Sequence, residues 1–107
     1  MATALNTFKS YAIDVTTVAN TVYTTPSDAT SIVLLAQVTN IGATDANVTV
    51  YTSLNGNTEL AKDFTIPVGD AASILTGKLV LEPGNSIAVF ANANSTITMT
   101  LSILETR

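Results

Sequence analysis

The chain has 107 residues, with four Lys and Arg against eight Asp and Glu for a net charge of −4, and it contains neither cysteine nor histidine. Charged residues make up 11% of it, against about 25% in an ordinary soluble domain, while hydrophobic residues make up 47% and the mean hydropathy is +0.41. These values predict one domain, exclude disulfides and the usual zinc sites, and argue against direct nucleic-acid binding, which needs a cluster of Lys and Arg.

The first part of the chain predicts three β-strands, because apolar side chains recur with period two rather than 3.6. The first strand has an irregular start and contains Phe8, Tyr11, Ile13 and Val15. The second covers residues 18–24 and ends at the turn-forming sequence TPSD. Residues 30–40 (TSIVLLAQVTN) are apolar on both faces in the middle, which predicts a central strand covered on both sides.

The middle of the chain predicts a hairpin. After a loop at residues 41–45, residues 46–54 alternate apolar and polar side chains, as a half-buried strand does. The dipeptide Asn55-Gly56 favours a type I′ turn. It leads into a return strand over residues 58–66, which the sequence PVGD closes.

Two short extended pieces follow at residues 72–75 and 78–81, either separate or as one strand interrupted by a bulge. The next residues, LEPGNSIAVF, contain a corner that no helix would tolerate. Pro83 fixes φ at the second position of the turn, and Gly84 supplies the positive φ that follows. The chain is therefore expected to reverse into a strand over residues 86–93.

The last strand covers residues 96–105, where apolar and polar side chains alternate almost strictly. The expected inward residues are Ile97, Met99, Leu101 and Ile103. The expected outward residues are Thr96, Thr98, Thr100 and Ser102. Seven to eight short strands, with turn signals about every 8 to 12 residues, predict an all-β fold: an antiparallel β-sandwich or jelly roll without significant helix.

Residues 1–9 have a weak pattern and are expected to form an N-terminal arm, with residues 10–107 as a single β-sandwich domain. The N-terminal sequence has neither a basic segment nor an apolar segment of the length that a signal peptide needs. The longest apolar run, residues 32–36, is far too short to span a bilayer. We therefore expect a soluble protein that is made, and stays, in the cytoplasm.

Catalysis is not expected, because most of the necessary side chains are missing. Without histidine, no Ser-His-Asp or Cys-His arrangement is possible. A serine activated by lysine would have to use Lys9, Lys62 or Lys78, and none of these lies in a recognisable motif. The acids are scattered, mostly at predicted turns, which favours turn formation and solubility over a catalytic pair; they are Asp14, Asp28, Asp45, Glu59, Asp63, Asp70, Glu82 and Glu105.

No cofactor or metal site is predicted. Calcium binding at the loop of Asp45 or Asp70 stays open, but no run of closely spaced acids suggests a cage. No glycine-rich loop connects a strand to a helix, so nucleotide binding is not expected either. Sugar-binding sandwiches stack rings on aromatic side chains, and Tyr23 and Tyr51 are the only candidates for that role.

Two other patterns have ordinary explanations. Thr96, Thr98 and Thr100 form a ladder that ice-binding or receptor-binding faces also show, but threonine is simply a good residue for an exposed strand. The glycosylation sequons at Asn47 and Asn94 would matter only in a secretory pathway. The surface is therefore expected to consist mainly of neutral Thr, Asn and Ser, which suits a subunit packed against neighbours.

Several segments together resemble small virion structural proteins of tailed bacteriophages. They are ANTVYTTP at residues 19–26, VTN at 38–40, ANVTV at 46–50, Ile66-Pro67, GKLVLEPGN at 77–85 and LSILE at 101–105. The resemblance covers nearly the whole chain, and its motifs are turns and strand ends. Such proteins often have Pro-Gly-Asp where this chain has Pro83-Gly84-Asn85, a difference that keeps the turn, removes a charge and argues against a metal there.

The resemblance implies a non-enzymatic structural subunit located in the virion and assembled in the bacterial cytoplasm. Its first expectation is a capsid decoration (cement) protein that binds a phage major capsid protein and itself, as a trimer or another symmetric oligomer. A tail, neck or fibre component that binds the host surface is an alternative. A hydrolase is a further alternative, for which Lys62, Lys78 and Glu82 would be the residues to test.

Overall fold

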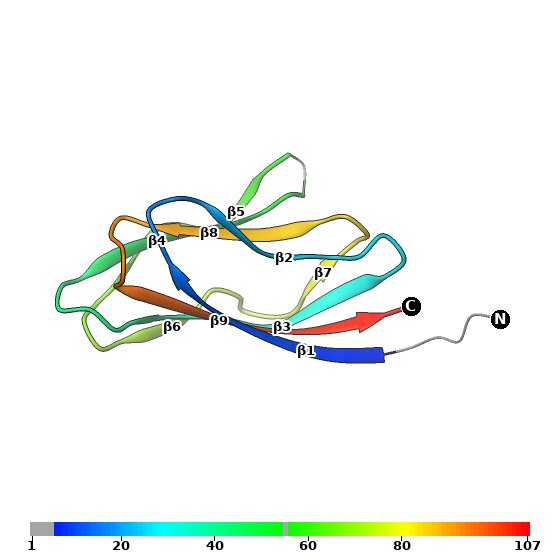
Figure 1. Ribbon diagram of the computed structural model, residues 1–107, viewed down its shortest axis with the longest axis horizontal. Coiled ribbons are helices and arrows are strands. Elements are labelled where there is room, and N and C mark those ends of the chain that lie inside the picture. Colours follow the sequence, from blue (N-terminus) through cyan, green and yellow to red (C-terminus); the bar gives the residue numbers. More distant parts are fainter. Residues whose placement is uncertain (1–5, 55) are drawn as a thin grey trace.

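Two antiparallel sheets face each other in the computed structural model, which describes residues 6–54 and 56–107 (Figure 1). Sheet A has the order β1-β9-β3-β6, and β7 also pairs with β3. Its strands are β1 (Asn6–Val15), β9 (Ile97–Thr106), β3 (Thr30–Asn40), β6 (Ala71–Ser73) and β7 (Leu79–Leu81). Sheet B has the order β2-β8-β4-β5. Its strands are β2 (Asn20–Thr24), β8 (Ser86–Ala91), β4 (Ala46–Thr52) and β5 (Thr58–Ile66).

The connectivity is that of a jelly roll once β6 and β7 are counted as one interrupted strand. Both pair with β3, β7 near its beginning and β6 near its end. The chain crosses between the sheets at almost every connection, and β4 and β5 form the one hairpin within sheet B. The expected antiparallel sandwich or jelly roll is therefore confirmed, and the interrupted strand accounts for nine strands where seven to eight were expected.

The core lies between the two sheets and consists mainly of β-branched and other aliphatic side chains. In β9 the expected inward residues are buried: Ile97, Met99 and Leu101 are fully covered and Ile103 is 1% exposed. They pack against fully buried valines of sheet B, among them Val48, Val50 and Val89. Period-two alternation thus produces the core directly, because each strand contributes one face to it.

The expectation that β3 is covered on both faces is wrong. Val33 and Val38 point into the core and are fully buried, but Leu34 is 38% exposed and Ile32 and Leu35 are only partly covered. No third layer lies over sheet A among the described residues (Figure 1). The apolar residues on the second face of β3 therefore belong to the surface of the protein.

The turn at Pro83 and Gly84 forms as expected. Gly84 has a φ of 85°, and the Asn85 N–H donates to the Glu82 carbonyl at 3.0 Å, which closes a β-turn. Thr25 holds this turn from the other side, since its N–H donates to the Asn85 carbonyl at 2.8 Å. In the hairpin between β4 and β5, Gly56 also has a positive φ, whereas Asn55 lies outside the described residues.

The described part of the chain begins and ends at the same end of sheet A. Residues 6–9, assigned to an N-terminal arm from sequence, form the start of β1, and Asn6 pairs with Thr106 of β9. The other residues of that arm, 1–5, lie outside the described part of the chain. Within residues 6–54 and 56–107, no helix is long and apolar enough to cross a membrane.

Candidate functional site

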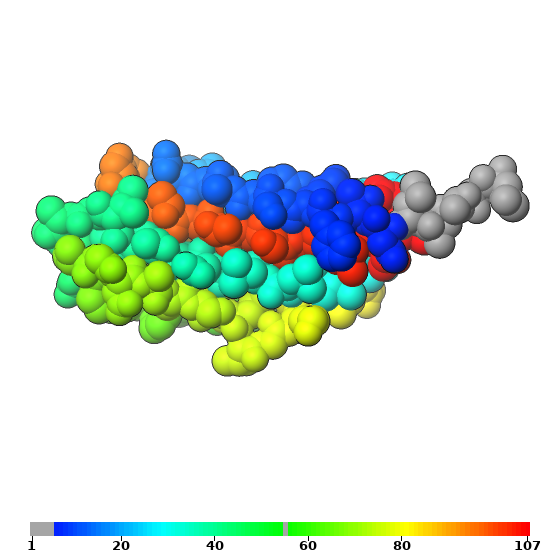
Figure 2. Space-filling model, turned by 90° about the horizontal axis from the view of Figure 1, so that it is seen from below, coloured from blue at the N-terminus to red at the C-terminus, as the bar shows by residue number. Residues whose placement is uncertain are grey.

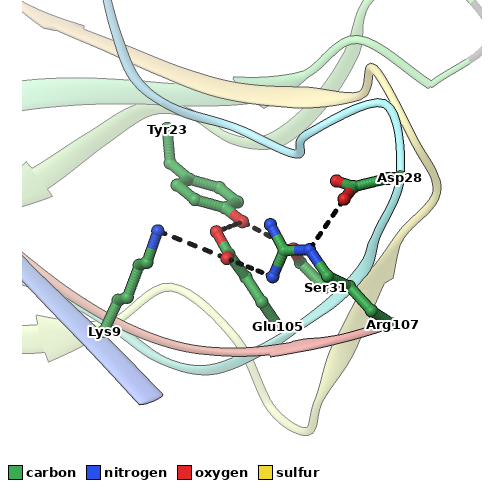
Figure 3. A network of polar contacts seen from close by, with 6 residues as sticks. All are labelled: Lys9, Tyr23, Asp28, Ser31, Glu105 and Arg107. Carbon is green, nitrogen blue, oxygen red and sulfur yellow. Dashed lines mark hydrogen bonds and ion pairs between the residues drawn. The ribbon is translucent and has the colours of Figure 1, made fainter. Parts of the chain in front are cut away.

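A buried carboxylate, Glu105, is the centre of a polar cluster between the two sheets (Figure 3). Glu105 is on an inward position of β9 and is 1% exposed. Tyr23, from β2 in the opposite sheet, donates its hydroxyl proton to Glu105 Oε2 at 2.5 Å. Because that proton is then used, the Ser31 hydroxyl of β3 donates to Tyr23 Oη at 2.6 Å. The cluster therefore joins sheet B to two strands of sheet A.

Two cations balance the Glu105 charge on the side toward solvent. Lys9 Nζ of β1 lies 3.2 Å from Glu105 Oε1, and Arg107 Nη1 lies 3.4 Å from the same oxygen. Arg107 Nε also donates to Asp28 Oδ2 at 3.0 Å, which ties the chain end to the loop after β2. A buried ionised carboxylate is tolerated only when it is paired and hydrogen-bonded in this way.

Near neutral pH, Tyr23 keeps its hydroxyl proton and Glu105 stays ionised. Burial, and then the adjacent Glu105 carboxylate, raise the pKa of Tyr23 to about 12. The Tyr23 hydrogen bond, with help from Lys9, lowers the pKa of Glu105 in spite of its burial. Both pKa shifts move away from neutrality, whereas a general acid or base works best with a pKa near the operating pH. The arrangement therefore links the two sheets and is not suited to proton transfer. We call its residues the clasp: Lys9, Tyr23, Ser31, Glu105 and Arg107.

A second feature is a row of apolar side chains across the outer face of sheet A. Four outward residues occupy matching register positions on neighbouring strands: Phe8 opposite Leu104, Leu104 opposite Ile32, and Ile32 opposite Val80. We call these four residues the apolar row. Phe8 is 74% exposed and Val80 is 52% exposed. Figure 2 shows the strands of this face side by side, with β1 blue, β9 red, β3 cyan and β7 yellow.

The rest of that face carries almost no charge. A β-bulge between Val33 and Leu35 pushes Leu34 out beside the row, which widens it. The other outward side chains on the described strands of sheet A are that of Leu35 and those of Thr, Ser, Asn, Gln and Ala residues, with Asp14 as the single charge. Asp14 lies six residues along β1 from Phe8, or about 20 Å away.

Two shallow grooves lie elsewhere on the surface. The first, of about 310 Å³, runs between the open edges of the two sheets and is lined by Leu60, Ala61, Lys62, Phe64, Ser73 and Ile74. Lys62 and Ser73 share this groove, but no hydrogen bond joins them among the described residues. The second, of about 360 Å³, lies on the outer face of sheet B and contains Tyr51 and Glu59.

Other residues considered from sequence have local structural roles. Asp45 Oδ1 accepts the Val68 N–H at 3.1 Å, and Asp70 Oδ1 accepts the Ala71 N–H at 2.8 Å, so both stabilise loops. No three acidic side chains gather into a metal-binding group in the parts of the chain that the structure describes. Tyr23 is buried inside the sandwich, which removes it as a sugar-stacking candidate, while Tyr51 is partly exposed.

Two positions differ from expectation. Thr96 was expected to point outward with Thr98 and Thr100, but it precedes β9, is 8% exposed and donates its hydroxyl to the Asn94 carbonyl. Glu105 was assigned to solubility, but it is the buried centre of the clasp. The strict alternation of residues 97–105 contains the missed signal, because it places Glu105 on the same face as Leu101 and Ile103.

No model of a known protein family and no curated protein sequence matches the chain. Solved structures do share its fold. A chain in the acid-stable capsid structure of Helicobacter pylori bacteriophage KHP30 is 8% identical, with 98% of this chain and 92% of that chain covered and a TM-score of 0.60. A chain of the T13 IBDV viral particle is 10% identical, with coverages of 96% and 31% and a TM-score of 0.61.

A third structure, of Bacillus endospore appendages described as disulfide-linked pili, contains a chain that is 11% identical, with coverages of 97% and 87% and a TM-score of 0.53. This chain spans about a third of the IBDV chain but most of the other two. At such identities the likeness concerns the fold alone. The fold is therefore one that structural proteins of capsids and pili also use.

Proposed function

We propose that the chain is a non-enzymatic structural subunit of a phage virion, and specifically a capsid decoration (cement) protein that binds the major capsid protein. The observation that carries this proposal is the outer face of sheet A, where the apolar row lies in an otherwise nearly uncharged surface. A contiguous exposed apolar patch is costly in water and is typical of a surface that another protein covers. The likeness to a KHP30 capsid chain of similar length supports the same reading.

The size of the face suits such a contact. β1 and β9 have 10 residues each, β3 has 11, and β6 and β7 have 3 each, which gives an area of about 600 Å² at the usual strand spacing and rise. A standard protein interface covers about 800 Å² on each partner. The face is therefore large enough to form most of one interface.

The net charge of the chain also favours the outer face of sheet A as the contact surface. Copies that each carry a net charge of −4 repel one another, so dense packing on a shell requires contacts through uncharged surfaces. Burying a large apolar side chain contributes about 1.5 to 3 kcal/mol, and association costs at least about 4 kcal/mol. One apolar row thus gives a weak contact, and a symmetric oligomer such as a trimer would strengthen it by binding at several points at once.

Rebinding to depleted particles tests this function. Particles from a phage with the gene disrupted are mixed with the purified chain, and bound copies are measured by cosedimentation. Wild-type chain should bind, and Phe8→Ser and Val80→Thr should each weaken binding by about tenfold, because each removes part of the row. Val18→Ser is the matched control, since Val18 is 69% exposed but lies in the loop after β1.

The possible results of this experiment distinguish the decoration role from attachment through another surface. Binding by the wild type and by Val18→Ser, with loss in the two row variants, supports the proposal. If the wild type does not bind, the decoration role is wrong. If Phe8→Ser binds as the wild type does, the chain is attached through another surface.

A further inference from the structure

The groove on the outer face of sheet B has the features of a built site. It measures about 360 Å³ and is lined by Thr49, Tyr51, Asn57, Glu59 and Phe90. These residues come from the neighbouring strands β5, β4 and β8 and from Asn57, which precedes β5; Tyr51 lies opposite Glu59 and Thr49 opposite Phe90. Because the outer faces of the two sheets point in opposite directions, the groove stays open when the apolar row is covered (Figure 1).

A distortion of β5 contacts one residue of this groove, Thr49. The register between β4 and β5 shifts on both sides of Val50, so β5 bulges. Within the bulge, Asp63 has a φ of 47°, a left-handed conformation that a non-glycine residue adopts at a cost. The Asp63 N–H donates to Thr49 Oγ1 at 3.0 Å, which fixes the threonine. Backbone strain of this kind is concentrated at functional sites.

Thr49 supplies a polar atom at the bottom of the groove. Its side chain is only 3% exposed, although it lines the groove. Its oxygen accepts the Asp63 N–H, so the hydroxyl proton can be donated to an acceptor in the groove. A ligand hydroxyl would provide such an acceptor.

The other lining residues restrict the chemistry of the ligand. None of the described residues that line the groove is cationic, and Glu59 would repel a phosphate or another anion. Tyr51 and Phe90 meet edge to face, with centroids 6.4 Å apart and an interplanar angle of 63°, so they do not enclose a cation between parallel rings. The groove instead combines a partly exposed aromatic ring with a carboxylate, an amide and a hydroxyl.

That combination fits a sugar. The C–H face of a pyranose packs on an aromatic ring, while its hydroxyls bond to carboxylate, amide and hydroxyl groups around it. We propose that the sheet B groove binds a neutral saccharide, with Tyr51 stacking on the sugar ring and with Glu59, Asn57 and Thr49 bonding its hydroxyls. This binding activity does not depend on the decoration role, because it uses the opposite face of the sandwich.

Titration of the full chain with methyl glycosides of glucose, galactose, mannose and N-acetylglucosamine tests the site. Amide resonances are followed by NMR, and at least one glycoside should shift those of residues 49, 51, 57, 59 and 90. Tyr51→Ala should weaken binding by about tenfold. Tyr51→Phe should retain it, because it keeps the ring, and Glu59→Gln should weaken it, because it loses one charged acceptor.

Phe64→Ala is the matched control, since Phe64 is an exposed aromatic residue of β5 in the other groove. It should bind the glycoside as the wild type does. No shift with any of the four glycosides overturns the proposal, as does equal binding by wild type and Tyr51→Ala with the fold intact. Choline and inorganic phosphate are titrated in parallel, and binding of either in place of the glycosides assigns the groove to another ligand and overturns the proposal.

Discussion

Glu105 occupies a position on β9 where alternation would place an aliphatic side chain. Its charge is retained there because Tyr23, Lys9 and Arg107 all contact the carboxylate. At the other end of β3, the buried Asn40 amide performs a similar task without charge, donating to the carbonyls of Thr44 and Ile66. Polar side chains thus join the two sheets at both ends of an apolar core.

Removing the Tyr23 hydroxyl should destabilise the protein. Tyr23→Phe loses a hydrogen bond to a charged group, which costs about 1.5 to 3 kcal/mol in the free energy of unfolding at pH 7. Because folding raises the pKa of Tyr23 from 10.0 to about 12, its contribution is complete below pH 10 and is lost as the pH rises to about 12. Urea unfolding of both proteins from pH 7 to 12 should show the difference shrinking, and a constant difference would contradict this account.

Low pH should affect Glu105, the other partner in the hydrogen bond of Tyr23. Folding lowers the pKa of Glu105, so its ionised form stabilises the protein above the ordinary value of 4.5, and this stability is lost as the pH falls through the lower folded value. Thermal unfolding should therefore show the melting temperature of the wild type falling more steeply below pH 4.5 than that of Glu105→Gln. Asp28→Asn is the control, because Asp28 is exposed and its pair with Arg107 should contribute little. Equal acid slopes in wild type and Glu105→Gln would refute the role of Glu105.

Among the elements, the strands and turns follow local rules that a single sequence contains. The expected strand at residues 30–40 has the bounds of β3, and that at 58–66 has those of β5. Contacts between side chains of different strands could not be derived from these local rules, because they depend on which strands pair and in which register. The apolar row exists only because Phe8, Leu104 and Val80, which are far apart in sequence, meet in register. The clasp similarly requires Tyr23 of one sheet to lie over Glu105 of the other.

The turn before β8 gives a test at this scale. Gly84 has a φ of 85°, where a side chain is strained, so Gly84→Ala should lower the free energy of unfolding by about 1 to 2 kcal/mol. Gly77→Ala is a matched control, because an added Cβ there meets nothing within 4 Å and no positive φ is required. Denaturant unfolding compares the two, and equal stabilities would show that the turn conformation is not costly for alanine.

At the scale of the whole molecule, the two outer faces of the sandwich differ. The sheet A face is nearly uncharged and carries the apolar row, which suits a contact with another protein. The sheet B face carries a groove with a carboxylate, which suits a small polar ligand. A subunit attached by the first face would present the second to its surroundings.

A cryo-EM reconstruction of the particle that contains the chain tests the central claim most directly. The proposed decoration role predicts a copy on the outside of the capsid, with the sheet A face against another protein and with Phe8 and Val80 covered. A reconstruction in which the sheet A face is open to solvent, with the chain held by sheet B or by its loops, would contradict it.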